Sequence, residues 1–227
     1  MIRHLTIALA ALGCVLSLQG AVFTFAPNDR DGDPDDLWDL DHRYWYTWGF
    51  KGFAIPTGEV ITEAVLTIAN INNWTAAEND GRNWLRMYLL DTAEKPNNGK
   101  VDEALPPAGR LRRYSDTDNG IDNIAPLNWT AKTHIATYTD YDGGPGGDVV
   151  TLTYSFARLG LLDELTAYIA NGNNFGLGFD PDCHYWNKGV QFTIHTAPQR
   201  VPDGGSTLAL LAFGVGTATL WGRRRSA

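Results

Sequence analysis

Segments that alternate between apolar and polar residues, or that are rich in aromatic residues, cover most of the chain between residues 22 and 200. In segment 59–71 apolar residues fall on both parities, as expected for a strand with both faces covered. Turn-rich loops separate these segments, and the arrangement predicts an all-β fold, an antiparallel β-sandwich of the jelly-roll type. The predicted strands are 22–25, 44–55, 59–71, 84–90, 134–139, 149–156, 175–179 and 190–196.

The period of the pattern changes in segment 159–170. Apolar residues recur there at helical spacing, and Gly172 follows as a typical helix end. We therefore expect one short helix to cap the sandwich. The residues at helical spacing are Leu161, Leu162, Leu165, Tyr168 and Ile169.

The first 21 residues have the layout of a secretory signal peptide. Arg3 and His4 precede an apolar run over residues 5–18, and the small residues Gly20 and Ala21 follow it. The run is short for a membrane helix, which needs about 20 apolar residues. We expect export of the chain and removal of segment 1–21 by signal peptidase.

The last 27 residues combine three parts in order: a short motif, an apolar run over 208–221 and a cluster of arginines. The apolar run can enter a bilayer, and the arginines favour the cytoplasmic side of the membrane. The motif consists of Val201, Pro202, Asp203, Gly204 and Gly205, and the cluster consists of Arg223, Arg224 and Arg225.

This tail resembles the PEP-CTERM sorting signal of exported bacterial proteins, with Asp203 in place of the usual Glu. The resemblance implies a transient inner-membrane anchor, cleavage near the motif by an exosortase, and delivery to the cell surface or extracellular matrix. A plain C-terminal membrane anchor is the alternative, and it also places the body outside the cytoplasm. The expected organisation is a signal peptide over 1–21, a β-sandwich domain over 22–200 and a sorting signal over 201–227.

A second resemblance concerns the body. Segments 63–68 (Glu-Ala-Val-Leu-Thr-Ile) and 84–90 (Trp-Leu-Arg-Met-Tyr-Leu-Leu) look like the front of DNRLRE-type sandwiches, which are similar to carbohydrate-binding modules. The later order of strand, short helix and Gly-containing strand matches as well. This resemblance supports the sandwich fold, and it implies carbohydrate as a candidate ligand.

Charge and cysteine content narrow the possible partners. The formal net charge is −8, and the only basic cluster lies in the tail, so nucleic acid is not an expected partner. Removal of the signal peptide takes Cys14 away and leaves Cys183 alone, so the mature chain cannot form an internal disulfide.

Stretch 29–36 carries carboxylates at every second residue and is the best candidate for a metal site. Ca²⁺ takes several oxygen ligands, and carboxylates at this spacing can converge on it. The stretch begins like an EF-hand loop but departs from one, because Pro34 and Leu40 stand where Gly and Glu are required. An irregular calcium loop and a solvated acidic loop both remain open. The candidate ligands are Asp29, Asp31, Asp33 and Asp35, with Asp180 and Asp182 as further candidates.

Two of the many tryptophans, Trp74 and Trp129, lie in polar Asn-Trp-Thr sequences. We expect them to be exposed and to stack on the C–H faces of sugar rings. The alternative is that the aromatic residues fill the core of the sandwich and pair across its strands.

The sequence contains no nucleophile elbow, metalloprotease motif, P-loop or dinucleotide fingerprint, so we do not expect an enzyme. Three hypotheses follow. The first is an exported, non-catalytic surface or matrix protein with extracellular polysaccharide as its candidate partner. The second is a secreted enzyme that cleaves polysaccharide, and the third is a purely structural envelope protein.

Overall fold

The structure is a computed structural model, and it describes residues 20–31, 36–75, 82–94, 103–105, 111–116, 121–144, 147–172 and 174–199. The chain divides into two compact units, Met1–Ala197 and Pro198–Ala227. All elements below belong to the first unit, apart from the last residue of the final strand. Residues 1–19 of the expected signal peptide and the whole expected sorting signal, 201–227, lie outside the described residues.

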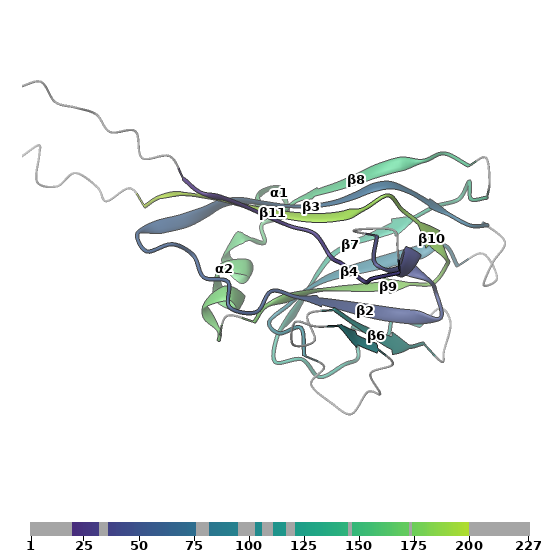
Figure 1. Cartoon of the computed structure of the whole chain (residues 1–227), viewed down its shortest axis with the longest axis horizontal. Coiled ribbons are helices and arrows are strands. Elements are labelled where there is room, and N and C mark those ends of the chain that lie inside the picture. The colour runs from purple at the N-terminus through teal and green to yellow at the C-terminus, as the bar shows by residue number, and fades with distance from the viewer. Residues whose placement is uncertain are drawn as a thin grey trace, which may run out of the picture. The chain divides into compact units, whose positions relative to one another are not determined.

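The described part of the chain is predominantly β, and its strands form two mostly antiparallel sheets (Figure 1). The first sheet has the order β1-β11-β3-β10, and a further strand, β8, also pairs with β3. Its strands are β1 (Val22–Phe25), β11 (Val190–Pro198), β3 (Glu59–Asn73), β10 (Tyr185–Trp186) and β8 (Val150–Ser155).

The second sheet has the order β5-β6-β2-β9-β4-β7. Its central strands β2, β9 and β4 pair antiparallel along their length. The sequence did not indicate β5, β6 or β10, because these short strands lie within polar or aromatic-rich stretches. The strands are β5 (Glu103–Leu105), β6 (Leu111–Ser115), β2 (Tyr44–Gly49), β9 (Gly176–Pro181), β4 (Trp84–Leu90) and β7 (Lys132–Thr139).

Both sheets contribute to one hydrophobic core. Leu66 and Ile68 enter it from β3, and Leu177 and Phe179 enter it from β9. All four side chains are fully buried, because alternate residues of each strand point to the side that the other sheet covers. Figure 1 shows β8, β3 and β11 in the upper layer and β9 and β2 in the lower one.

The helical segment follows β8, as predicted, and a short additional helix precedes it. Ser155 ends the strand and caps α1 (Phe156–Leu159), since its hydroxyl accepts a hydrogen bond from the backbone N–H of Arg158 at 3.2 Å. Gly160 then adopts a left-handed conformation with φ 71°, and α2 (Leu162–Ala170) begins after it. The helix predicted over 159–170 is therefore α2, which begins three residues later, and Gly160 separates it from the additional turn of helix α1.

Strand β3 changes the side that faces the core partway along its length. Leu66 and Ile68 point inward, and a register shift between Ile68 and Ile71 then inserts a bulge. Asn70 lies in this bulge with φ 50°. After it Ile71 and Asn73 are fully buried, so Asn70 and Asn72 point away from the core.

Neither of the two described α-helices has the length and apolar character that a membrane crossing requires. The apolar run over 208–221 lies outside the described residues.

Candidate functional site

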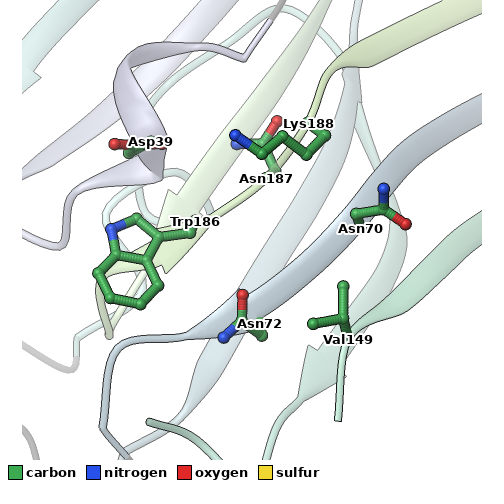
Figure 2. Close-up of a pocket in the computed structure, with 7 residues that line it drawn as sticks. All are labelled: Asp39, Asn70, Asn72, Val149, Trp186, Asn187 and Lys188. Atoms are coloured by element: carbon green, nitrogen blue, oxygen red, sulfur yellow. The ribbon is translucent and has the colours of Figure 1, made fainter. Parts of the chain in front are cut away.

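A pocket of about 630 Å³ opens beside the bulge of β3 (Figure 2). Its lining combines one large aromatic ring with three side-chain amides, a carboxylate and an ammonium group. In Figure 2, Trp186 and Asp39 lie to one side, Asn70 and Val149 to the other, and Asn187 with Lys188 between them. The lining residues are Asp39, Asn70, Asn72, Val149, Trp186, Asn187 and Lys188.

The bulge in β3 brings two of the amide side chains to the pocket. Because it reverses the alternation of β3, Asn70 and Asn72 both leave the core side and line the pocket. Two backbone hydrogen bonds, each 2.8 Å long, join Ala69 to the loop after β10: Lys188 donates to Ala69, and Ala69 donates to Gly189. The loop that carries the remaining polar groups is thus tied directly to the bulge.

Trp186 belongs to a small aromatic surface. Its ring stacks on that of Trp74, with centroids 5.9 Å apart and planes 23° apart. The His184 ring meets the Trp74 ring edge-on at 5.0 Å. Trp74 is 47% exposed, which confirms the expected exposure, although its role in sugar binding stays a prediction.

A left-handed turn over residues 37–40 brings Asp39 to the pocket. Leu37, Trp38, Asp39 and Leu40 have φ values of 58°, 52°, 54° and 47°. Such a conformation costs about 1–2 kcal/mol for each residue with a side chain, so the surroundings must stabilise it. Leu37 and Leu40 are fully buried in the core, and the Trp38 ring stacks 5.8 Å from the Tyr46 ring.

An acidic cluster lies directly before this turn. Asp29, Asp31 and Asp36 each place one carboxylate oxygen within 4.8 Å of one from each of the others. The Asp29 carboxylate also accepts hydrogen bonds from the backbone N–H groups of Asp31, at 3.3 Å, and of Trp38. The structure thus brings two of the predicted ligands together and adds Asp36, while Asp33 and Asp35 lie outside the described residues.

Asp36 is the most buried member of the cluster, with only 1% of its surface exposed, and Asp29 is buried as well. Within the described ranges neither of its carboxylate oxygens accepts a hydrogen bond from an N–H or O–H group. Burial first, and the neighbouring Asp29 carboxyl second, raise the pKa of Asp36 to about 8.

The acidic cluster and the pocket share a contact through Asn187. The Asn187 side-chain amide donates to the backbone carbonyl of Asp36 at 2.7 Å, and its carbonyl oxygen accepts from the Gly189 N–H at 3.1 Å. Asn187 is buried and also lines the pocket. The position of the acidic loop is therefore coupled to the pocket wall.

The further candidates Asp180 and Asp182 lie at the end of β9, in a different environment. The Arg86 guanidinium lies 2.7 Å from the Asp182 carboxylate and 3.9 Å from that of Asp180. Asp180 also accepts hydrogen bonds from the backbone and side chain of Asn123. The Arg86 side chain thus lies close to both carboxylates, where a metal ion was predicted. Among the described residues, Asp180 and Asp182 do not belong to the cluster that contains Asp29 and Asp31.

Trp129 was predicted to be exposed, and this prediction is wrong, because the residue is only 4% exposed. It packs in a second apolar cluster, with its ring edge-on to Trp45 at 6.2 Å. Its indole N–H donates to the Thr92 carbonyl at 2.9 Å, which satisfies the one polar group of the ring. Trp129 is therefore not available for a sugar. Cys183 is fully buried.

None of the seven residues that line the pocket was among the site residues predicted from the sequence. The lining residues Trp186, Asn187 and Lys188 follow one another directly, just before Gly189. An aromatic residue followed by an amide and a charge at a turn is a pattern that could have indicated a binding loop.

Comparison of the chain with protein-family models, with curated proteins and with solved structures finds no match. The pocket offers amide donors and acceptors, one carboxylate, one ammonium group and a flat indole surface.

Proposed function

We propose that this protein is an exported, exosortase-sorted component of the bacterial cell surface or extracellular matrix, and that its jelly-roll-like β-sandwich binds carbohydrate without catalysis. The observation that carries the proposal is the position of Trp186, whose ring lines a pocket together with the three amides of Asn70, Asn72 and Asn187.

The chemistry of the lining suits a sugar. An indole presents a flat apolar surface to the C–H face of a sugar ring, while amides and carboxylates bond its hydroxyl groups. Ligand pockets typically occupy 300–1,000 Å³, and the pocket of about 630 Å³ falls within that range. Asp39 and Lys188 carry opposite charges in the lining, so a neutral glycan is the best fit.

The sandwich itself is part of the proposal. Two sheets that fill one core support it, because this is how a β-sandwich is built. Binding residues are often found in loops that a rigid scaffold positions, and four of the seven lining residues, Asp39, Val149, Asn187 and Lys188, lie in connections between strands.

A glycan array probed with the full-length chain tests carbohydrate binding. We expect reproducible binding to a related set of neutral glycans. Release of shortened sugars from the bound glycans would favour the enzymatic alternative, and absence of binding across the array would contradict the proposal.

Export and sorting rest on the two ends of the sequence and need a separate test. Expressed with its exosortase, the chain should lose mass at both ends. Changing Arg223, Arg224 and Arg225 to Gln should release uncut precursor from the membrane, because the cytoplasmic stop is lost. Changing Pro202 and Asp203 to Ala should instead leave a membrane-bound, uncut precursor. Identical behaviour of the two variants would contradict the proposed roles.

A further inference from the structure

We propose that Asp29, Asp31 and Asp36 together bind one Ca²⁺ ion, and that this ion fixes the left-handed turn over residues 37–40. The proposal concerns the cluster itself and does not require that the pocket bind a glycan.

The spacing of the three carboxylates fits one ion. Oxygen atoms bound to the same Ca²⁺ at 2.3–2.6 Å lie at most about 5.2 Å apart. One oxygen from each of the three carboxylates lies within 4.8 Å of the others. The hydrogen bonds that Asp29 accepts use only part of the capacity of its two oxygens, which leaves lone pairs for a cation.

The buried side chain of Asp36 distinguishes this cluster from an ordinary group of acidic residues on a protein surface, and it points to a bound ligand. This side chain is almost completely buried, and within the described part of the chain no N–H or O–H donor reaches either oxygen. An ionised carboxylate that is buried without a donor is strongly unfavourable, so the group either keeps its proton or has a cation to compensate its charge. The Asp36 carboxylate belongs to the same group of oxygens as those of Asp29 and Asp31, so an ion held there would supply that compensation.

The chemistry of the donors selects the ion. All three are carboxylates, which are hard oxygen ligands and favour Ca²⁺ or Mg²⁺ over the metals that prefer nitrogen and sulfur. Mg²⁺ demands nearly octahedral geometry at 2.0–2.1 Å and gives up its water reluctantly. An irregular loop of carboxylates is better suited to Ca²⁺, which accepts a flexible coordination geometry.

The ion would act on the turn through short connections. The backbone N–H of Trp38, inside the turn, donates to the Asp29 carboxylate. Asp36 directly precedes Leu37, the first residue with positive φ. An ion that holds Asp29 and Asp36 together therefore holds both the entry of the turn and its second residue.

The test uses the full-length chain after treatment with EDTA and desalting. Calorimetry with CaCl₂ should show saturable uptake of one ion per chain. Ca²⁺ at about 100 times its Kd should raise the melting temperature by roughly 5–11 °C, since the ion binds only the folded state. Mg²⁺ at the same concentration should give a smaller shift.

Asp36→Asn should abolish the calcium response while the metal-free variant melts no lower than metal-free wild type, because Asn keeps the size of the side chain and never carries a charge. Asp31→Asn, at an exposed position, should weaken calcium binding without unfolding the chain. Asp163→Asn, an exposed acid in the first turn of α2, is the matched control and should respond like wild type. No heat and no melting shift in wild type, or an unchanged response in both Asp36→Asn and Asp31→Asn, would overturn the proposal.

Discussion

Trp74 and Trp186 lie nearly parallel, with ring centroids 5.9 Å apart and planes 23° apart. Trp186 lines the pocket, and Trp74 extends the aromatic surface beyond the lining. Backbone pairing holds this arrangement, because Trp186 of β10 pairs with Asn72 of β3, and the Trp74 N–H donates to the His184 carbonyl at 2.8 Å. The strand pair thus determines which faces of the two rings a ligand can reach.

The two Asn-Trp-Thr sequences allow a matched test of burial. Trp129→Ala should lower the free energy of unfolding by about 3–5 kcal/mol, because a large ring leaves a packed cluster. Trp74→Ala should lower it by about 1 kcal/mol or less, since the ring is 47% exposed and loses mainly its stacking contact. Urea denaturation of both variants measures the difference. An equal loss of unfolding free energy in the two variants would contradict the difference in burial between the two rings.

Asn70 offers a test of the bulge. Asn tolerates the left-handed conformation far better than a β-branched residue does. Asn70→Val should therefore destabilise the fold by about 1–3 kcal/mol, whereas Asn70→Gly should be neutral or slightly stabilising. Chemical denaturation of the two variants compares the same position with and without a branched side chain. A Val variant as stable as the Gly variant would contradict a left-handed Asn70.

Much of the fold could be predicted from the sequence, because hydrophobic alternation reports which residues face a core. Strands β1 and β4 begin and end where the pattern predicted them. The alternation of 59–71 also indicated a central strand, and β3 pairs with three others. A strict period of two would place Asn70 on the same side as Leu66, however, and the bulge after Ile68 reverses that side.

The pocket could not be predicted in this way, because it depends on long-range pairing. Asp39 and Lys188 are far apart in sequence, and both come to the pocket through elements that meet only in the folded chain. Trp74 and Trp129 show the same limit, since identical neighbours accompany opposite burial. Local sequence specifies a turn, whereas burial depends on what packs above it.

The raised pKa of Asp180 predicts how the stability of the fold depends on pH. Burial raises its pKa to about 8; Asp122 and Asp182 add to this shift, and hydrogen bonds from Asn123 oppose it. Arg86 is the cation that faces the same group, with its guanidinium 3.9 Å from the Asp180 carboxylate.

Because the folded-state pKa lies above the ordinary value, the contribution of Asp180 favours folding below about pH 4 and is lost as the pH rises through about 8. Asp180→Asn should reduce the fall in the urea midpoint between about pH 5 and about pH 8. A variant whose pH profile runs parallel to that of wild type would contradict the raised pKa.

The central claim is that Trp186 forms part of a carbohydrate-binding surface. The most direct measurement is the calorimetric affinity of the full-length chain for a glycan selected on the array, compared among wild type, Trp186→Ala and Tyr141→Ala. Tyr141 is 77% exposed and lies outside the pocket lining, so it controls for loss of an exposed aromatic ring. We expect Trp186→Ala to weaken binding by about thirtyfold or more, equivalent to about 2 kcal/mol, while Tyr141→Ala binds like wild type. Wild-type affinity in a correctly folded Trp186→Ala variant would contradict the claim.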